Sequence, residues 1–488
     1  MTTLITLTIV APLIAAALGL ALRARAMPRD VVTLAGLTVA AVSSFAMLIT
    51  VASDGSTSLN VGGWSRELGI VLVADLFAVL VLPIALTIIL VVELFAIGQR
   101  RTAWGANPEL AGPLLLVLTS GVSLAILTGD LFTLFVAFEL ILVSSYVLLT
   151  HQGQRGQVRS GMTYVVMNLF ASALFLLGLA IVSSATGTVN LSLLAERIPE
   201  LSTGARVGIG SWFFIVFGTK AAMFPLFSWL PDSYPTAPTT ITAVFAGLLT
   251  KIGIYAMIRF HTLTGMHELG STMLIIAGVT MIVGAFGALA QSDVKRILSF
   301  HVISQIGYML MGLGLFTAAG TTGAILFLIH HMPVKTVLFL VGGLIENHQG
   351  TSALDRSGGL ARRRPAIALL FAVPALSLAG LPPFSGFVAK LGVISAGVEA
   401  EQFLAVAVAL IAGALTLLSM TKIWTGVFWG EPMEASMTAP AVQASPANRR
   451  LMMLAATAAV IGTLAISVSA GGLYDLSERA ATELLETR

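Results

Sequence analysis

The sequence predicts an all-α polytopic membrane protein with about fourteen spanning helices. Of its 488 residues, 57% are hydrophobic and only 10% are charged, whereas soluble domains carry roughly 25% charged residues. Apolar stretches of the ~20 residues that a spanning helix needs recur along the whole chain. No soluble fold could bury this much apolar sequence, so we expect a lipid bilayer to surround most of the molecule.

Each expected span is an apolar segment bounded by polar residues or by glycine and proline. The apolar N-terminus has no basic residue ahead of it, so we interpret it as the first span and not as a cleaved signal peptide. The polar segment 190–201 is expected to form a short surface helix. The spans lie near 2–22, 31–52, 70–98, 111–129, 131–150, 162–184, 207–229, 240–260, 272–290, 298–316, 320–345, 366–396, 402–429 and 450–472.

Basic residues alternate between the two sets of loops, as the positive-inside rule requires. With the N-terminus outside, fifteen lysines and arginines fall inside and six fall outside. A missed or extra helix would scramble this alternation, so the pattern supports the count and predicts that both termini face outside. The inside set is Arg23, Arg25, Arg29, Arg100, Arg101, Arg155, Arg159, Lys295, Arg296, Arg356, Arg362, Arg363, Arg364, Arg449 and Arg450, and the outside set is Arg66, Arg197, Arg206, Arg259, Arg479 and Arg488.

Two parts of the chain resemble each other. Residues 173–181 read ALFLLGLAI and residues 337–345 read VLFLVGGLI, at an offset of 164, while Tyr146 and Tyr308 align at an offset of 162. The shared order predicts two units of five helices, and because five is odd the second unit is inverted in the membrane. The chain then divides into a three-helix segment 1–110, the repeats 111–261 and 272–429, and a last helix with a tail, 430–488.

Proline predicts a broken helix at the same place in each repeat. Pro225 to Pro238 interrupts the seventh span, and Pro374, Pro382 and Pro383 interrupt the twelfth. The sequence Pro225-Leu-Phe-Ser228 also resembles Pro382-Pro-Phe-Ser385, at an offset of 157. Paired broken helices in inverted repeats are typical of secondary transporters and mark the substrate pathway.

Lysine and arginine occupy different places in this chain. The arginines lie in loops or at span ends, whereas five of the six lysines lie within apolar segments. Arginine cannot lose its proton at working pH, but a lysine in an apolar environment can. A central lysine costs about 2.5–3.5 kcal/mol on insertion scales, so it is a functional hypothesis by default. The five are Lys220, Lys251, Lys335, Lys390 and Lys422.

We expect four of these lysines, together with histidine, to form a proton relay. Lys220 and Lys251 lie in mid-helix, and Lys390 follows the second proline break. His331 and Lys335 are four residues apart and share a helix face, and neutral histidine can both accept and donate a proton. His330 points about 100° away from His331 and is a secondary candidate. The alternative for each lysine is a structural ion pair, and for each histidine a hydrogen-bonded packing role.

Two further residues complete this hypothesis. Glu139 is the one acid deep in a span, and Lys220 is its natural partner, since an unpaired carboxylate there would be protonated. Such a pair could act as a switch when its charges separate and rejoin. His301 takes the place of Glu139 in the second repeat and is a weaker candidate. Lys422, beside Trp424 and Trp429, is interpreted as a lysine that extends to the interface, and Asp75, Glu93, Asp130 and Glu346 are interpreted as interfacial.

The residue patterns that thiolate metal sites, thiol catalysis and dinucleotide binding require are not found in this sequence. There is no cysteine, so thiolate metal sites, iron–sulfur clusters and thiol catalysis are excluded. The seven histidines show no zinc-ligand spacing, and no GxGxxG motif follows a strand. We therefore expect no cofactor, no metal site and no enzymatic activity. The net charge of +3 is spread over loops and does not indicate nucleic-acid binding.

Residues 218–259, GTKAAMFPLFSWLPDSYPTAPTTITAVFAGLLTKIGIYAMIR, resemble the signature of the antiporter-like membrane subunits. This superfamily includes the large subunits of Mrp-type sodium/proton antiporters and the proton-pumping membrane subunits of respiratory NADH dehydrogenase. The segment LPDSYPTAP, residues 230–238, is most similar to the D-type branch of the Mrp antiporter subunits. The resemblance covers essentially the whole chain, and Thr239 and Thr240 are a small departure from it.

The resemblance implies fourteen helices in two inverted repeats, with helices seven and twelve broken. It also implies a Glu–Lys pair at Glu139 and Lys220, central residues at Lys251, His331 and Lys335, and a terminal group at Lys390, where some relatives have glutamate. The implied partners are the A, B, C, E, F and G types of subunit, protons and Na⁺, in a bacterial plasma membrane. A redox-driven proton pump and a non-transporting scaffold subunit remain as alternatives.

Overall fold

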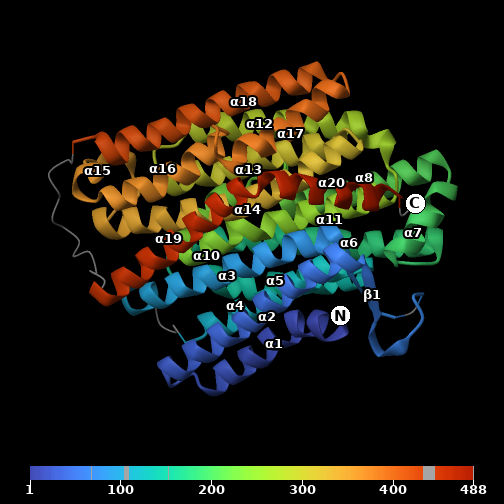
Figure 1. The fold of residues 1–488 in the computed structure, drawn as a ribbon, viewed down its shortest axis with the longest axis horizontal. Coiled ribbons are helices and arrows are strands. Elements are labelled where there is room, and N and C mark those ends of the chain that lie inside the picture. Colours follow the sequence, from blue (N-terminus) through green and yellow to red (C-terminus); the bar gives the residue numbers. More distant parts are fainter. Residues whose placement is uncertain (68, 104–108, 152, 432–445, 487–488) are drawn as a thin grey trace.

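The computed structural model describes residues 1–67, 69–103, 109–151, 153–431 and 446–486. Figure 1 shows a bundle of helices that run along the long axis of the molecule. Within the described residues, eleven helices are long and apolar enough to cross a membrane, and Ala111–Leu127 and Pro365–Ala379 are shorter apolar helices. This confirms a predominantly helical membrane fold, while the number of crossings itself stays a prediction.

The N-terminal segment holds three long helices and a small hairpin. Its helices are α1 (Thr2–Ala21), α2 (Ala26–Asp54) and α3 (Leu76–Ala103), and the antiparallel strands β1 (Thr57–Asn60) and β2 (Val71–Ala74) connect α2 to α3. We expected a span to begin at residue 70, but residues 71–74 form β2 instead. These residues are extended because β2 pairs with β1 and because the Val71 carbonyl accepts a hydrogen bond from the Gly129 backbone at 2.7 Å.

The described residues of the first predicted repeat form eight α-helices and two short 3₁₀ turns, Ile198–Glu200 and Tyr234–Thr236. The expected surface helix is present as α7. The α-helices are α4 (Ala111–Leu127), α5 (Leu131–Thr150), α6 (Arg155–Thr186), α7 (Leu191–Arg197), α8 (Thr203–Ala221), α9 (Trp229–Ser233), α10 (Thr239–Val244) and α11 (Thr250–Leu263), with a π-helical turn, Phe245–Leu249, between α10 and α11.

The second predicted repeat and the C-terminal part follow the same plan. Their helices are α12 (Gly270–Ala290), α13 (Val294–Gly314), α14 (Ala318–Gln349), α15 (Leu360–Arg363), α16 (Pro365–Ala379), α17 (Ser385–Glu399), α18 (Phe403–Ile423), α19 (Pro446–Val468) and α20 (Ala470–Glu486). A second π-helical turn, Trp424–Trp429, extends α18.

Both proline-rich spans are broken, the second beside Pro382 and Pro383 as predicted. Pro374, however, lies inside α16 and does not interrupt it. The first span stops at Ala221, because Ala222 takes a left-handed conformation with φ 62°, and helix resumes at Trp229. The second stops at Ala379, because Gly380 takes φ 88°, and helix resumes at Ser385. A helix end leaves backbone carbonyls without their usual partners, and at the second break the Ala379 carbonyl accepts a hydrogen bond from Lys390 Nζ at 2.9 Å.

A pair of backbone bridges supports the internal repeat. Asp130 caps the N-terminus of α5 and bridges to Asn190, while Asp293 caps the N-terminus of α13 and bridges to Ala353. The backbone bonds beside the first bridge, Leu131 N to Val189 O and Leu191 N to Gly129 O, recur 163 residues later as Val294 N to Ser352 O and Leu354 N to Ser292 O. The loop beside α7 lies at the right of Figure 1 and the loop before α15 at the left, as inverted copies require.

We call the end of the bundle with the β1–β2 hairpin and α7 the hairpin end. The N-terminus and the C-terminal helix α20 lie toward this same end (Figure 1). Several predicted inner arginines lie at the opposite end, around α15, while the side chains of Arg100, Arg101 and Arg488 lie outside the described residues. The N-terminus and α20 thus share one end of the molecule, and the side of the membrane that this end faces stays a prediction.

The buried axis of the bundle is formed by α14 together with α10 and α11. The most apolar stretches of these helices are entirely buried, and α14 packs on α3, α13, α17 and α19. Outer helices instead expose large apolar side chains such as Ile14, Phe170, Leu404 and Ile461. A bilayer or a neighbouring subunit would cover these outer faces, so the polar residues of the axis are shielded from lipid.

The C-terminal helix α20 was not expected, since the sequence analysis treats the residues after the last span as a tail. It is amphipathic and lays Ser477, Ala480, Ala481 and Leu484 against α3, α11 and α14. Its charged residues prevented its recognition as a span.

Candidate functional site

The four predicted relay lysines and His331 are buried inside the bundle, whereas Glu139 is half-buried. Lys220, Lys251, Lys335 and Lys390 are 5%, 1%, 0% and 6% exposed, and His331 is 0% exposed. They come from α8, α11, α14 and α17, so that both broken spans and both central helices contribute. The fold therefore brings into one buried region side chains that are up to 170 positions apart in the sequence.

Lys220 lies one residue before the end of α8, at the first break. Its Nζ donates to Ser172 Oγ at 3.0 Å and to the Asn168 carbonyl at 3.3 Å, both on α6. The ammonium also lies 5.4 Å from the centre of the Phe138 ring on α5. A helix C-terminus favours a nearby cation, so the break itself makes this a suitable place for a lysine.

A small cavity adjoins this lysine. It has a volume of about 20 Å³ and is lined by Tyr164, Asn168, Lys220 and Trp229, among others. A cavity of roughly 10–15 Å³ holds one water molecule when polar groups surround it. The space beside the Lys220 amine is therefore large enough for one water molecule.

Glu139 lies on α5, next to Phe138, and is half-buried. Its Oε1 is buried and has no hydrogen-bond partner in the described part of the chain. The ion pairs among the described residues do not include Glu139 with Lys220, whose amine bonds to Ser172 and Asn168. The structure thus shows the two charges apart, and their pairing stays a prediction.

Lys251 follows the π-helical turn Phe245–Leu249. Its Nζ donates to the Ala246 carbonyl within that turn and to Thr250 Oγ1 at 3.2 Å. A π-turn shifts the backbone hydrogen bonds and is frequent at functional sites. The neighbouring Gly247 is packed against α14, where an added Cβ would lie 2.1 Å from Thr336 Oγ1. Lys251 therefore follows a turn whose backbone packs closely on α14.

The long helix α14 carries His330, His331 and Lys335. Lys335 Nζ donates to the Leu298 carbonyl of α13 at 3.1 Å. His330 Nδ1 lies 2.8 Å from Ser385 Oγ of α17. Both ring nitrogens of His331 are buried without a hydrogen-bond partner among the described residues. Buried polar atoms almost always have a hydrogen-bond partner, so two unpartnered ring nitrogens are unusual. One nitrogen of a neutral imidazole can accept a proton and the other can donate one.

Lys390 occupies the second break. Its Nζ donates to the Ala379 carbonyl, the last of α16, at 2.9 Å, and lies 5.1 Å from the centre of the Tyr308 ring. A Cβ at Gly380 would approach Lys390 Cδ to 2.6 Å, so glycine there provides both the left-handed turn and the room for the lysine. Lys220 precedes its break and Lys390 follows its break, but both lie at broken helix ends.

Similarity to known proteins decides the family. The model of the family described as NADH:quinone oxidoreductase/Mrp antiporter, TM, matches residues 128–416. The chain belongs to this family. Its match covers the span from the Asp130 cap to α18 and so includes every predicted relay residue.

This chain is similar to curated relatives over most of their length and most of its own. It is 46% identical over 392 residues to the D-type subunit of the Na⁺/H⁺ antiporter of Alkalihalophilus pseudofirmus, and the match covers 80% of this chain and 79% of the relative. It is 37% identical over 441 residues to the protein of the same name from Bacillus subtilis, covering 89% of this chain and 88% of the relative.

Two solved complexes contain chains with the same fold. The Mrp complex of Dietzia sp. DQ12-45-1b has a chain with a TM-score of 0.91 and 33% identity, covering 100% of this chain and 98% of that one. A membrane-bound sulfane sulfur reductase, an archaeal respiratory membrane complex, has a chain with a TM-score of 0.89 and 25% identity, covering 99% and 98%. The resemblance inferred from residues 218–259 is confirmed.

The sequence did not reveal several polar neighbours of the buried lysines and histidines in this antiporter-family chain. Ser385 bonds to His330, and Ser377 Oγ lies 3.2 Å from Ser385 Oγ. His301 Nε2 lies 2.5 Å from Ser419 Oγ, while both polar atoms of Gln305 are buried without a partner among the described residues. Serine is common in membrane helices, so its presence does not indicate a functional site. Gln305, in contrast, is an amide within a span, one helical turn from His301, and the sequence alone marks it as a candidate.

Lys422 lies apart from this row. Its Nζ donates to the Leu289 and Gln291 carbonyls, each at 2.7 Å, at the C-terminus of α12. Replacing Lys422 with alanine is expected to lower ion transport by less than roughly two-fold, since the side chain caps a helix end and touches none of the relay residues. Transport measured in membrane vesicles checks this. A severe loss would mean that Lys422 belongs to the pathway.

Proposed function

We propose that this chain is the D-type, ion-translocating subunit of a hetero-oligomeric sodium/proton antiporter, driven by the proton gradient. The observation that carries the proposal is the row of four buried lysines and one unpartnered histidine, which lies between two broken helices in the described part of the chain. A scaffold subunit would not need four intramembrane lysines, at about 2.5–3.5 kcal/mol each on insertion scales.

The proposed relay consists of Glu139, Lys220, Lys251, His331, Lys335 and Lys390, with His330 as a secondary member. Each of the four lysine amines is held by carbonyl or hydroxyl oxygens, and none forms an ion pair among the described residues. A neutral amine still has N–H groups to donate, so each lysine can lose its proton and keep its hydrogen bond. His331 lies between them on α14 and can accept and donate in turn.

The other subunits of the complex are the proposed partners, of A, B, C, E, F and G type. The relatives named as D-type antiporter subunits and the chain in the solved Mrp complex support this assembly. The redox-driven alternative is supported by the chain in the respiratory complex, at 25% identity. Identities of 46% and 37% to the subunits named as antiporters favour exchange without a redox reaction.

We place the protein in the bacterial plasma membrane with both termini on the outer side. Fifteen basic residues against six favour this orientation. The N-terminus and α20 lie toward the same end of the bundle, which agrees with an even number of crossings (Figure 1). In this orientation the hairpin end faces outward.

The test is sodium-induced collapse of a proton gradient in everted vesicles that contain the chain with its gene neighbours. An antiporter collapses the gradient on addition of Na⁺ without any redox substrate. If the vesicles respond only when a redox donor such as NADH is supplied, the respiratory alternative holds and the antiporter proposal is wrong.

A further inference from the structure

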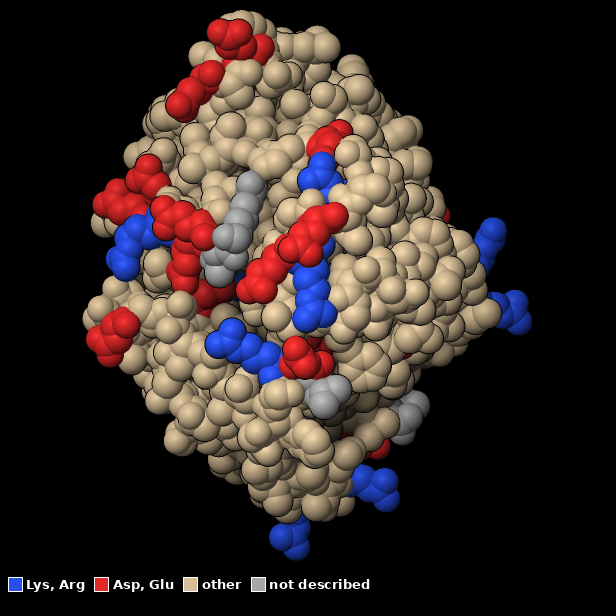
Figure 2. Space-filling model, turned by 90° about the vertical axis from the view of Figure 1, so that its right-hand side faces the viewer, with Lys and Arg blue, Asp and Glu red and all other residues tan. Residues whose placement is uncertain are grey.

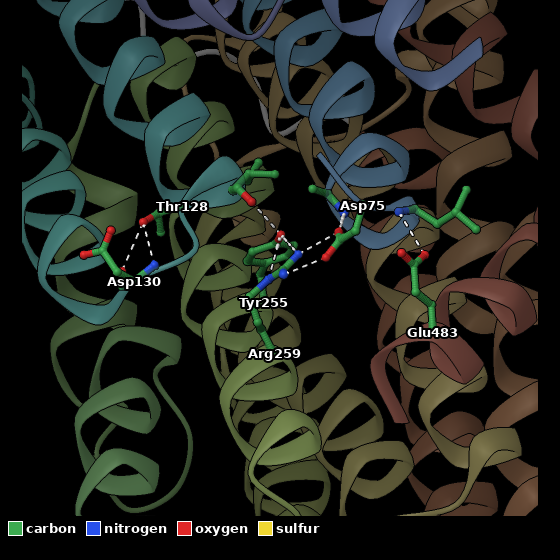
Figure 3. Close-up of polar contacts among 9 residues, drawn as sticks. Asp75, Thr128, Asp130, Tyr255, Arg259 and Glu483 are labelled. Atoms are coloured by element: carbon green, nitrogen blue, oxygen red, sulfur yellow. Dashed lines mark hydrogen bonds and ion pairs between the residues drawn. The ribbon is translucent and has the colours of Figure 1, made fainter. Parts of the chain in front are cut away.

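A buried ion pair joins two helices between the relay and the hairpin end. Arg259 of α11 donates from Nη1 and Nη2 to the two carboxylate oxygens of Asp75 at 2.7 and 2.8 Å (Figure 3). The arginine side chain is 6% exposed and the aspartate side chain 11% exposed. We expected Arg259 in an outer loop and Asp75 at an interface, but α11 continues to Leu263 and buries the pair.

Tyr255 lies between this pair and Lys251 along α11. Lys251, Tyr255 and Arg259 are each four residues apart on α11, so they lie one above the other on the same helix face. The Tyr255 hydroxyl donates to the Ile126 carbonyl at 2.6 Å and accepts from Arg259 Nη2 at 2.7 Å and Nε at 3.2 Å. With one proton and two lone pairs, a hydroxyl in this arrangement is fully occupied, so it cannot take part in proton transfer until Arg259 moves away.

A cavity lies beside these groups. It has a volume of about 10 Å³ and is lined by Ala125, Thr128, Tyr255 and Arg259, among others. This volume is close to the roughly 10–15 Å³ that one water molecule needs. The polar side chains of the lining are Thr128, in the turn before α5, and Tyr255 and Arg259 of α11. One water there could reach the Tyr255 hydroxyl once Arg259 has moved away.

The surface above the ion pair is rich in acidic groups. Figure 2 views this end and shows Asp and Glu side chains gathered across its middle, with a few basic side chains among them. Asp75 is fixed to the start of α3, since its Oδ1 accepts from Ala78 N at 2.9 Å. Glu483 of α20 reaches the same helix start and accepts from Leu76 N at 3.5 Å. The ion pair therefore lies one layer below the surface of the hairpin end.

We propose that Tyr255, Arg259 and Asp75 form a gated proton passage between Lys251 and the hairpin end of the bundle. In the structure the gate is closed, because Arg259 is bound to Asp75 and occupies both acceptor positions of Tyr255. When the ion pair separates, the hydroxyl becomes free to accept a proton from the adjacent cavity and to pass its own proton toward Lys251. This inference rests on the proposed proton relay and assigns that relay a proton entry at the hairpin end.

A purely structural clamp is the competing explanation, and the substitution of Tyr255 by phenylalanine separates the two. Phenylalanine keeps the ring that stacks on Phe77 at 4.4 Å and leaves the Asp75–Arg259 pair in place, removing only the hydroxyl. A clamp would then function normally. A passage would lose its transfer group, and we expect sodium/proton exchange by the assembled complex to fall by roughly ten-fold or more.

Breaking the gate gives the opposite phenotype. In Asp75→Asn vesicles we expect a proton gradient to decay several-fold faster without Na⁺, because the passage stays open. Adding Tyr255→Phe to Asp75→Asn should suppress this leak. The matched control is Arg206→Gln, which breaks the Arg206–Glu268 ion pair. This pair joins α8 to the turn before α12, and its side chains are 26% and 29% exposed. That variant should not leak.

The proposal is overturned if assembled Tyr255→Phe exchanges at the wild-type rate, or if assembled Asp75→Asn has no leak or a leak that Tyr255→Phe leaves unchanged. If Asp75→Asn does not assemble, Tyr255→Phe alone decides. The leak measurement needs only a proton gradient. A wild-type complex without sodium exchange would therefore refute the antiporter function while the gate is still tested.

Discussion

Replacing Lys220 with alanine is expected to lower sodium-dependent proton exchange by roughly 100-fold or more, the usual effect of losing a proton-transfer group. The amine lies at the end of α8, bonds to Ser172 and Asn168, and borders a cavity of about 20 Å³. Alanine would remove the proton carrier and enlarge this cavity, and it would break none of the ion pairs among the described residues. The complex should therefore assemble, and the loss should be one of transport.

The measurement is the gradient-collapse assay in vesicles, with the amount of assembled complex determined in the same preparation. Lys422→Ala is the matched control, because it also removes a lysine amine bound to backbone carbonyls in a spanning helix. Lys220→Arg adds a second test, since arginine keeps the positive charge but cannot release its proton. Wild-type exchange by assembled Lys220→Ala would exclude this lysine from the relay.

The sequence was sufficient for the class of fold and for the places where helices break. Apolar length predicted the spans, and Pro225 and Pro382 marked the two interruptions that the structure shows at Ala222 and Gly380. Lysines within apolar segments identified the buried row, because a charge there needs a reason. These predictions depend on local composition, which a single sequence displays directly.

Contacts between distant segments could not be predicted in this way. Arg259 and Asp75 are 184 residues apart, and each lies near a span end, so composition placed both at the surface. The strand β2 reads as an apolar span and becomes extended only through its pairing with β1 and Gly129. Helix α20 is too charged for a span, and its apolar face is recognisable only when α3, α11 and α14 are seen to cover it.

The Glu139–Lys220 pair lies between these two cases. Sequence identified both residues and suggested that they attract each other, but the described ion pairs do not join them. The carboxylate leaves Oε1 buried and without a partner among the described residues, while the amine bonds to neutral oxygens of α6. A switch needs two states, one with the Glu139 and Lys220 charges paired and one with them apart. A permanent pair could not change its charge state easily, and the structure corresponds to the separated state.

Replacing Glu139 with glutamine is therefore expected to lower exchange by roughly ten-fold, since loss of about 1.4 kcal/mol of charge–charge interaction corresponds to that factor. Glutamine keeps the shape of the side chain but can no longer draw the Lys220 ammonium from Ser172. Glu139→Asp retains the charge and is the control, with a smaller loss expected. Exchange rates and assembled complex are compared for all three forms in vesicles. If Glu139→Gln matches wild type, the carboxylate charge has no part in moving the Lys220 proton, and the row must operate from Lys220 onward without a switch.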